Sequence, residues 1–560
     1  MSLWRDETVE PAEQRWLLWI IAIYLAAISL PYLWAALFAP FDFVYQWLLY
    51  NVDDQNVHLA WARQAQEGHF FLRDLFTGET LDSTQAPLFN NLFTWLMGTL
   101  ARITGAPPIL FYHVLRLVFA ALCLKWLHAL CAQFTTDRRI RLAGVALAAF
   151  AGGAGWLARF FPATQSFFTD WPGGTNAMPE AYTFLSALIF PLFIASMALL
   201  TLIYLLVLRA QETNNWRLAA GAGATALLLG NIHTYDVLPL DVVMLAWAAW
   251  SWKTTKNRNR MTWLAPIIVI GSTLPPLFYQ VFVFFNSAEF QIKALTRTAP
   301  PPLFSVLLSY GPLLLLALVG AWHWRKNPRA PLIMLWLVVT LLCIFAPVSF
   351  GRKMIEGAHL PLCLLAGAGL VALAQNLRAP FSRRVAVIVI LGISSFSSLN
   401  FALWCLENAA QNNRERDQFF LPPPSLETRD VAALEFLKRS PIARDKAVLS
   451  LPYLGNYIPQ KTGRVVFAGH WAETLNFFDP ATRSGKLTEL QRFYGIGGRQ
   501  MSADEARAWL QKNRIGLVVL GDYEKRWGAT LPLKLPLLQS FGGTKFSGGV
   551  ARVEIYRVLD

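Results

Sequence analysis

Two adjacent carboxylates, Asp53 and Asp54, directly follow the first long apolar stretch of the chain. His58 lies four residues after Asp54, so both side chains share one face if the segment is helical. A carboxylate beside another carboxylate has a raised pKa, closer to that of a useful general base. Acids also favour helix N-termini, so capping is the alternative. The position directly after an apolar segment strengthens the catalytic interpretation.

Two adjacent cations, Arg352 and Lys353, stand at the expected outer end of another apolar segment. This placement opposes the usual bias of Lys and Arg towards cytoplasmic loops, so an anionic partner is expected. A lipid phosphate or pyrophosphate fits, because a guanidinium can bind phosphate oxygens in bidentate fashion. Snorkelling of both side chains to phospholipid headgroups is the alternative.

A third polar group, His233-Thr234-Tyr235-Asp236, lies where one apolar segment ends and the next begins. His233 could bind phosphate, donate to a sugar or hold a metal. It could equally be a satisfied structural histidine in a tight turn. Both interpretations stay open.

A fourth group, His470, Trp471 and Glu473, follows a predicted strand near the C-terminus. A loop at this place could close over a membrane cavity. The faces of tryptophan rings stack on sugars, and a glutamate can accept hydrogen bonds from their hydroxyls. Helix capping or core packing is the favoured alternative for these residues.

The unusual polar groups in or beside the apolar segments all fall on the same, outer side of the expected topology. Ionisable groups at membrane depth are costly and tend to serve function. A transporter would also need a polar lining through the midplane. An enzyme with a lipid-borne substrate needs a cavity at one interface only. The groups are Asp53, Asp54, His58, Glu180, His233, Tyr235, Asp236, Arg352, Lys353, Glu356 and His359.

Composition indicates a membrane protein. Of 560 residues, 55% are hydrophobic and 15% are charged, and the mean hydropathy is +0.38. A soluble protein carries roughly a quarter charged residues. The net charge is +14, and the basic residues lie in short clusters between apolar runs. Such clusters are typical of residues that set the orientation of membrane spans, so the charge does not indicate nucleic-acid binding. All 5 cysteines fall within apolar segments, so we expect neither a disulfide framework nor a cysteine-based metal site.

About eleven transmembrane helices are expected between residues 16 and 405, after a cytoplasmic tail at residues 1–15. The first apolar run, 16–38, is too long for a signal-peptide core and is expected to be retained. A long outer loop, 39–108, follows. Placing its apolar stretch 88–104 at the outer surface keeps every later basic cluster inside. Eight of the other spans are predicted at 109–134, 142–161, 180–208, 218–232, 261–285, 330–350, 356–374 and 385–405. Two more are expected between these: one runs from the turn after residue 232 to residue 252, and one ends at the basic cluster that begins at residue 325.

From residue 406 to residue 560 the composition is that of a soluble domain. Amphipathic patterns predict helices over 428–439 and 502–513. Short apolar runs predict strands over 447–451, 465–468, 517–520 and 550–558. An odd number of spans after a cytoplasmic N-terminus places this small α/β domain outside the cell membrane.

With these features the chain resembles the GT-C superfamily of integral-membrane glycosyltransferases, which includes protein mannosyltransferases and the lipid A aminoarabinose transferase. The resemblance is carried by Asp53-Asp54 in the long first outer loop, by Gly351-Arg352-Lys353 at a span end, and by the soluble segment Gly469–Thr474. It implies a polytopic α-helical fold in a bacterial inner membrane. It further implies inverting transfer of a sugar from a polyprenyl-phosphate donor to an acceptor hydroxyl of a lipid, glycan or protein.

The resemblance also implies roles for single residues. Asp54 or Asp53 matches the catalytic carboxylate, and we prefer Asp54 because it shares a face with His58. The two carboxylates could also hold a divalent metal such as Mg²⁺ or Mn²⁺, although the sequence contains no closed ligand set. The residues expected to bind the donor phosphate are Arg352, Lys353, His233, His58 and Tyr235. Those expected to contact the acceptor or the sugar are His470, Trp471 and Glu473.

Two other functions stay open. A lipid-linked-glycan ligase or transporter would carry charged residues deep in several spans, and the sequence has few. A non-catalytic membrane scaffold of GT-C fold would use its 22 tryptophans for partner contacts or for anchoring at the membrane interface. Assembly of a scaffold would survive loss of the carboxylates, whereas turnover of an enzyme would not.

Overall fold

The computed structural model describes residues 10–82, 86–172, 176–254, 259–287, 290, 298–412, 421–442, 444–478, 485–542 and 552–559. The chain packs as two compact units. The first comprises Met1–Pro31, Tyr112–Phe282 and Arg297–Trp404, and the second comprises Tyr32–Phe111, Val283–Thr296 and Cys405–Asp560. Of the expected N-terminal tail, residues 1–9 lie outside the described part of the chain.

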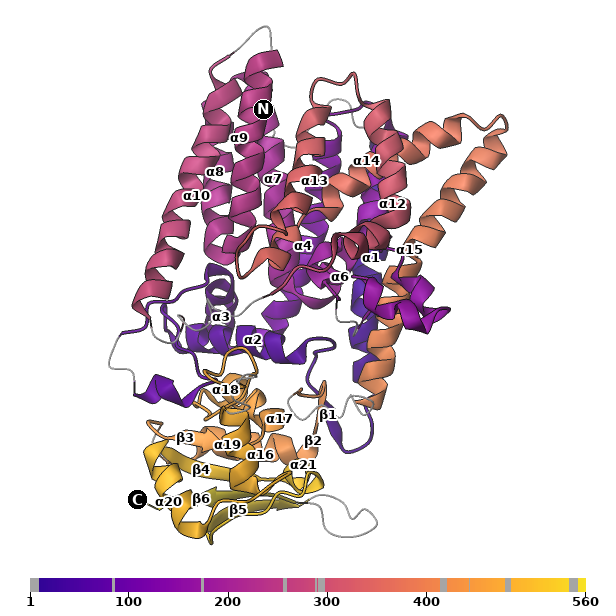
Figure 1. The fold of residues 1–560 in the computed structure, drawn as a ribbon. Helices are drawn as coiled ribbons and strands as arrows, with labels where there is room; N and C mark the ends of the chain where they lie inside the picture. Colours follow the sequence, from indigo (N-terminus) through magenta and orange to yellow (C-terminus); the bar gives the residue numbers. More distant parts are fainter. Residues whose placement is uncertain are drawn as a thin grey trace. The chain divides into compact units, whose positions relative to one another are not determined.

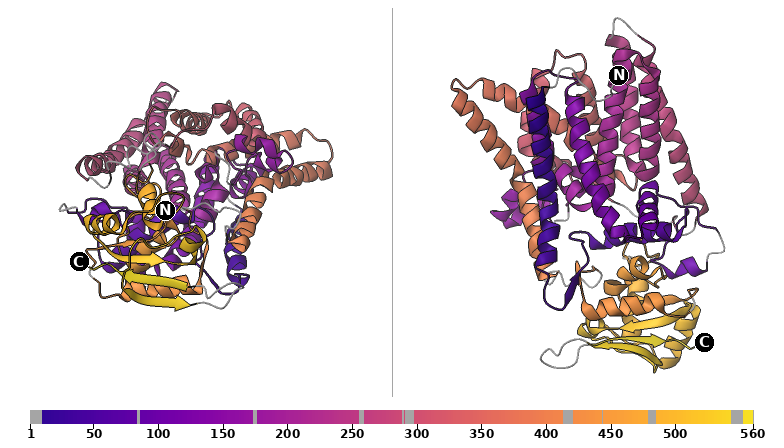
Figure 2. Two further views of the ribbon diagram at one scale, coloured as in Figure 1. Left: turned by 60° about the horizontal axis from the view of Figure 1, so that its bottom comes forward. Right: turned by 180° about the vertical axis from the view of Figure 1, so that it is seen from behind.

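Long apolar helices make up most of the first unit, and Figures 1 and 2 show them from three directions. Among the described residues, 7 helical segments are long and apolar enough to cross a membrane, which confirms a polytopic helical membrane protein. The count of eleven spans stays a prediction. The helices are α1 (Pro11–Leu37), α4 (Pro108–Cys131), α5 (Arg138–Phe150), α6 (Thr183–Ile189), α7 (Pro191–Thr213), α8 (Trp216–Ile232), α9 (Val237–Thr254), α10 (Met261–Asn286), α12 (Leu303–His323), α13 (Ala330–Cys343), α14 (His359–Gln375) and α15 (Pro380–Gln411).

Two of the expected spans are interrupted. Within 180–208 the chain breaks at Phe190, where α6 ends and α7 begins with Pro191, because proline lacks an N–H and restricts the preceding residue to extended backbone. Within 142–161, α5 ends at Phe150. Beyond it, the carboxylate of Asp170 accepts the backbone N–H of Gly153 at 2.7 Å and that of Gly155 at 3.0 Å. These bonds replace continued helix with a turn.

Residues 39–108, the expected first outer loop, form two short helices of the second unit, α2 (Val52–Glu67) and α3 (Leu92–Thr104). With 13 residues, α3 is about 20 Å long, too short to span a membrane. It packs tightly on α2, since a Cβ added to Gly98 would lie 2.1 Å from the carbonyl oxygen of Ala62. The expected stretch 88–104 is therefore a short helix held on α2.

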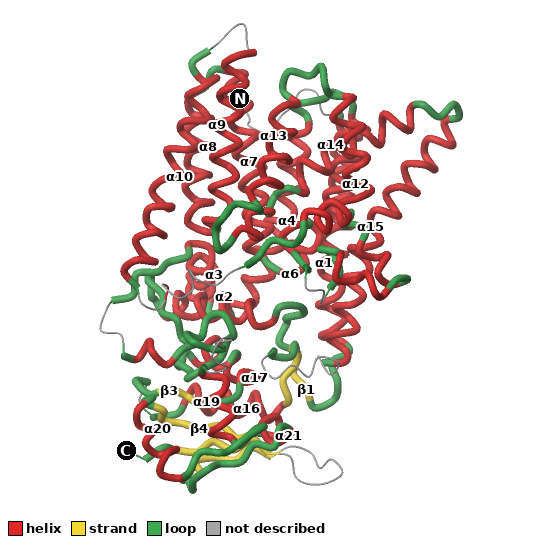
Figure 3. Tube along the Cα trace, viewed as in Figure 1, coloured by secondary structure: helices red, strands yellow, loops and turns green. Residues whose placement is uncertain are grey.

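The C-terminal part of the second unit is a small α/β domain, as expected. Its sheet has the strand order β3-β4-β6-β5, in which β3 (Ala447–Leu449) runs parallel to β4 (Ile515–Leu520). The last two strands, β5 (Leu537–Gly542) and β6 (Arg552–Arg557), are antiparallel, as are β4 and β6. Figure 3 shows these strands in yellow. The helices of this domain are α16 (Thr428–Arg439), α17 (Pro452–Gly455), α18 (Tyr457–Thr462), α19 (Lys486–Tyr494), α20 (Ala503–Lys512) and α21 (Asp522–Arg526).

The sequence prediction for this domain differs from the structure in two places. The predicted strand 465–468 is wrong, because Val466 and Ala468 make only isolated bridges, to Val448 and Thr77. Strand β5 was not predicted, because most of its residues are exposed and carry no alternating apolar pattern. A small antiparallel pair, β1 (Phe43–Tyr45) with β2 (Ser425–Glu427), also joins the first outer loop to the start of the domain.

The buried carboxyl group of Glu524 makes the stability of this domain depend on pH. Its Oε2 accepts the N–H of Gly521 at 2.9 Å, and burial raises its pKa to about 7. An unfolded glutamate titrates near 4.3, so the folded state binds more protons between about pH 4 and 7. The stabilisation from this group is full below the unfolded pKa and is lost as the pH rises through about 7.

We therefore expect Glu524→Gln to weaken the pH dependence of stability, by about 3 kcal/mol between pH 4 and pH 8. The thermal unfolding midpoint of the purified chain, measured across this range, checks the prediction. Glu505→Gln is the matched control, because Glu505 forms an exposed ion pair with Arg492 that contributes little. An identical pH profile for wild type and Glu524→Gln would contradict the prediction.

Candidate active site

Helix α2 presents the acidic pair in its first turn. Its N-cap is Asn51, in the left-handed conformation with φ 52°, and the cap makes no side-chain hydrogen bond. The two carboxylates are therefore not the capping residues, although the helix N-terminus favours their negative charge. Asp53 is 6% exposed, whereas the side chain of Asp54 is 45% exposed. Asp54 is thus the one that a substrate can reach.

Two side chains from the C-terminal part of the same unit contact this pair. Trp471 donates its indole N–H to Asp53 Oδ2 at 3.0 Å. His470 Nε2 lies 3.2 Å from Asp54 Oδ1 and 3.6 Å from Asp53 Oδ2. The structure thus brings together four of the residues singled out in the sequence. Contact of His470 and Trp471 with an acceptor or a sugar stays a prediction.

The tautomer of His470 follows from its backbone contacts. Its Nδ1 accepts the N–H groups of Ala472 and Glu473, both at 3.1 Å. A nitrogen that accepts two hydrogen bonds carries no proton, so Nε2 holds the proton and donates it to Asp54. His470 therefore holds the Asp54 carboxylate in a fixed orientation.

Electrostatics separate the two aspartates. Burial and the charge of Asp54 raise the pKa of Asp53, against the lowering effects of His470 and Trp471. For His470, burial lowers the pKa, but the hydrogen bond to Asp54 and the two carboxylate charges raise it overall. The two backbone donors at Nδ1 oppose that rise, because they favour a neutral ring. The resulting arrangement is a buried Asp53 with a raised pKa beside a half-exposed Asp54.

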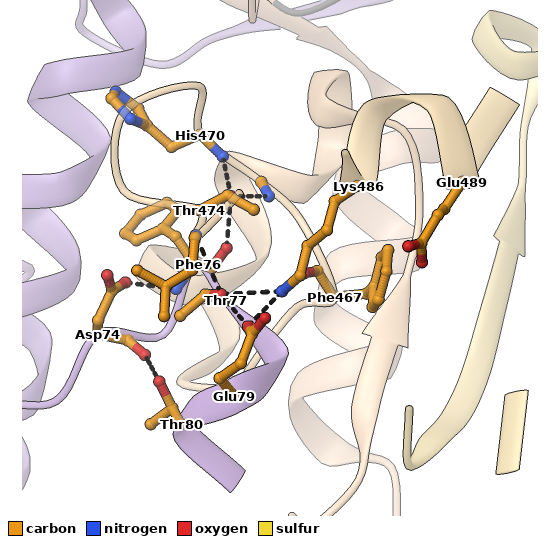
Figure 4. A network of polar contacts seen from close by, with 12 residues as sticks. Asp74, Phe76, Thr77, Glu79, Thr80, Phe467, His470, Thr474, Lys486 and Glu489 are labelled. Carbon is orange, nitrogen blue, oxygen red and sulfur yellow. Dashed lines mark hydrogen bonds and ion pairs between the residues drawn. The ribbon is translucent and has the colours of Figure 1, made fainter. Parts of the chain in front are cut away.

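The loop that carries His470 is fixed to the first outer loop by a polar network (Figure 4). Thr474 donates its hydroxyl to the carbonyl oxygen of Phe76 at 2.7 Å and accepts the N–H of His470 at 3.1 Å. Lys486 donates to Thr77 Oγ1 at 3.0 Å and forms an ion pair with Glu79. Neither Thr77 nor Lys486 was predicted as a site residue. They lie hundreds of residues apart, and no sequence motif indicates that they contact each other.

His58 lies on α2 four residues after Asp54, as predicted, and stacks on Trp61 with ring centroids 5.5 Å apart. Glu473 contributes its backbone N–H to His470. Binding of a donor phosphate by His58 and of a sugar by Glu473 are predictions that these contacts do not test.

The first unit holds the second group of predicted site residues. Arg352 and Lys353 lie in the 3₁₀ helix η6 (Gly351–Ile355). Arg352 Nε lies 3.4 Å from Glu180 Oε1, and the ammonium of Lys353 lies 4.7 Å from the ring centroid of Tyr235. Three of the residues expected to bind the donor phosphate are thus placed on η6 or packed against it.

Two histidines of this unit, His233 and His359, have different surroundings. His233 Nδ1 lies 3.0 Å from Asp236 Oδ2 and 3.4 Å from Glu356 Oε2. His359 is fully buried, with its Nδ1 2.9 Å from the hydroxyl of Thr183. His359 is therefore a hydrogen-bonded core residue, whereas His233 belongs to an acidic cluster.

Two groups of described residues are close enough to hold a metal ion: Asp53, Asp54 and His470, and His233, Asp236 and Glu356. In the first group Nε2 of His470 carries a proton, so the two carboxylates would have to hold the ion. Oxygen ligands suit Mg²⁺ and Mn²⁺. The acidic pair therefore fits an oxygen-coordinated ion held without the imidazole.

Comparison with known proteins gives structural matches alone. No family model and no curated protein matches the chain. The oligosaccharyltransferase AglB from Archaeoglobus fulgidus, solved with an inhibitory peptide and a dolichol-phosphate, matches with a TM-score of 0.53 and 12% identity over 97% of this chain and 74% of that one. The same oligosaccharyltransferase has also been solved with Zn and sulfate.

Two further solved structures match along nearly the whole chain. ArnT from Cupriavidus metallidurans, bound to undecaprenyl phosphate, matches with a TM-score of 0.52 and 10% identity over 97% of this chain and 98% of that one. The arabinofuranosyltransferase AftD from Mycobacteria matches with a TM-score of 0.50 and 16% identity over 97% and 41%. At such identities a match shows the fold alone. The expected resemblance is confirmed: the chain has the fold of the GT-C glycosyltransferases.

Proposed function

We propose that the chain is an inverting glycosyltransferase that moves a sugar from a polyprenyl-phosphate donor to an acceptor hydroxyl at the outer face of the membrane. One observation carries the proposal: a half-exposed carboxylate, Asp54, is oriented by the protonated Nε2 of His470. The GT-C fold supports the donor class, because ArnT and AglB have been solved with undecaprenyl phosphate and dolichol-phosphate.

In the proposed reaction Asp54 is the general base. One of its carboxylate oxygens takes the proton of the acceptor hydroxyl while the acceptor oxygen attacks the anomeric carbon. The bond from that carbon to the phosphate oxygen breaks, and the polyprenyl phosphate leaves with the electron pair. Attack from the opposite side inverts the anomeric configuration, through a centre with oxocarbenium character. Base assistance of this kind contributes roughly 10²–10⁴-fold.

His470 and Asp53 support the base in this scheme. The Nε2–H of His470 bonds one oxygen of Asp54 and so orients its carboxylate. Asp53 accepts the indole N–H of Trp471, and burial and the charge of Asp54 raise the pKa of Asp53.

The leaving phosphate needs positive charge, which we assign to Arg352 and Lys353 of the first unit. Arg352 has a side chain that is 30% exposed, so its guanidinium can bind phosphate while Glu180 keeps it in place. Lys353 is held over Tyr235. A divalent ion such as Mg²⁺ or Mn²⁺ at the acidic pair would add electrostatic stabilisation of the phosphate when bound.

We place the C-terminal domain and the site outside a bacterial inner membrane, with the N-terminus in the cytoplasm. This orientation rests on the positive-inside bias of the basic clusters. It makes the acceptor a lipid, glycan or protein hydroxyl that is reachable from outside.

Incubation of the purified chain with radiolabelled polyprenyl-phosphate sugars and membrane acceptors tests the proposal. We expect the label to move to an acceptor with release of polyprenyl phosphate. If no donor is consumed and variants of the carboxylates still support the cell phenotype, the scaffold function replaces the enzyme. Movement of an intact lipid-linked glycan across the membrane without bond cleavage would instead indicate a transporter.

A further inference from the structure

A buried acidic cluster in the first unit is separate from the proposed base. His233 precedes and Asp236 ends the short 3₁₀ helix η5 (Thr234–Asp236), which joins α8 to α9. Glu356 directly follows η6. The three residues are 6%, 2% and 2% exposed, respectively. Two segments far apart in the sequence therefore bring two carboxyl groups and one imidazole into the interior of this unit.

The hydrogen bonding of this cluster is incomplete. Both oxygens of Glu356 and the Oδ1 of Asp236 are buried without a hydrogen-bond partner among the described residues. The hydroxyl of Ser196 lies within reach of both carboxyl groups as a side-chain donor, but it donates to the carbonyl oxygen of Leu192 at 3.0 Å. Nδ1 of His233 also lies near both carboxyl groups and carries one hydrogen at most, so it cannot donate fully to both.

Such an arrangement is costly unless a cation compensates it. A buried carboxylate without a partner loses several kcal/mol of hydration. Of the nearby cations, Lys353 acts on Glu356 through its charge while its ammonium lies over the ring of Tyr235, and Arg352 Nε faces Glu180. A cation held by the cluster itself would compensate both carboxylates and use their unpartnered oxygens.

The spacing of the ligand atoms fits a small divalent ion. Zn²⁺ binds nitrogen and carboxylate oxygen at about 2.0–2.2 Å in tetrahedral sites, so neighbouring ligand atoms lie about 3.4 Å apart. In this cluster Nδ1 of His233 lies 3.0 Å from Asp236 Oδ2 and 3.4 Å from Glu356 Oε2. All three ligand atoms lie within 4.8 Å of one another. Three ligands would leave a fourth position for water or a substrate oxygen.

We propose that His233, Asp236 and Glu356 form a binding site for a divalent transition-metal ion of the Zn²⁺ or Mn²⁺ type. The imidazole nitrogen favours these ions over Mg²⁺ and Ca²⁺, which prefer oxygen ligands throughout. The ion ties the turn between α8 and α9 to the segment after η6, next to Arg352 and Lys353. The proposal is independent of the reaction assigned to the chain.

The metal content of the purified full-length chain tests this site. After incubation with Zn²⁺ or Mn²⁺ and removal of free ions, mass spectrometry of the elements gives the ion-to-protein ratio. We expect Glu356→Gln and Asp236→Asn each to lower the affinity at least ten-fold, since loss of even an outer partner of a ligand costs 10- to 100-fold. Asp241→Asn is the matched control, because Asp241 lies on α9 but bonds Thr273 instead.

A second measurement starts from the wild-type chain. Addition of Zn²⁺ or Mn²⁺ to the metal-stripped wild type is expected to raise its thermal unfolding midpoint, because the ion binds the folded state. In the double variant Asp53→Asn/Asp54→Asn, the metal still raises the unfolding midpoint if it binds at the His233 cluster. The midpoint stays unchanged if the metal binds at the acidic pair. Absence of the rise in wild type, its loss in Asp53→Asn/Asp54→Asn, or an unchanged ion affinity in Glu356→Gln would overturn the proposal.

Discussion

Replacement of Asp54 by asparagine is expected to lower the rate of sugar transfer by about 10²–10⁴-fold, the contribution of a positioned general base. Asparagine keeps the size of the side chain and can still accept the hydrogen bond from His470, so the fold stays intact. It cannot take a proton from an acceptor hydroxyl. The initial rate of transfer, measured at saturating donor with equal amounts of protein, gives the effect.

Two companion variants make this result specific. Glu67→Gln, at the other end of α2, removes an exposed carboxylate that pairs with Arg63 and is expected to leave the rate unchanged. Asp53→Asn is expected to have a smaller effect than Asp54→Asn, because Asp53 is buried and bonded to Trp471. Undiminished transfer by Asp54→Asn, with loss in Asp53→Asn, would assign the base to Asp53 instead.

The second large effect is expected at Arg352. Arg352→Gln should weaken binding of the polyprenyl-phosphate donor by about 10- to 100-fold, because a hydrogen bond to a charged group contributes about 1.5–3 kcal/mol. The side chain is partly exposed and lies beside Glu180, so we expect little loss of core packing. Equilibrium binding of labelled polyprenyl phosphate to the purified chain measures the change.

The control for Arg352 is another arginine of the same unit. Arg329 forms a partly exposed ion pair with Glu212, and the positive-inside bias places it on the cytoplasmic side. Arg329→Gln is therefore expected to bind the donor as wild type does. Equal donor affinity in wild type and Arg352→Gln would show that another group binds the phosphate.

Much of the fold could be predicted because its physical cause is local. Long apolar runs predict helices such as α10 and α12 wherever the chain must satisfy its own backbone in a membrane. The amphipathic pattern of 428–439 gave α16 with the same bounds. The break at Pro191 depends on the backbone restriction that proline imposes, and the end of α5 depends on the carboxylate of Asp170 from a later loop. A hydropathy pattern detects neither.

The site was predictable in its residues but not in its contacts. Asp53 and Asp54 stand out because two acids directly after a span are unusual. Their partner His470 is 416 positions away from Asp54, and no local rule links the two. The protonation of Nε2 depends on two backbone N–H groups at Nδ1, which only coordinates reveal. The unpartnered oxygens of Glu356 are likewise a property of the packed structure.

Transfer and donor binding, measured on the same preparations of wild type, Asp54→Asn and Arg352→Gln, test the central claim most directly. A general base at Asp54 and a phosphate ligand at Arg352 predict that Asp54→Asn binds the donor normally and transfers sugar about 10²–10⁴-fold more slowly. They also predict that Arg352→Gln loses donor affinity and, at low donor concentration, transfer. Full transfer by Asp54→Asn at wild-type donor affinity would contradict the account, because the carboxylate that His470 orients would then have no part in the reaction.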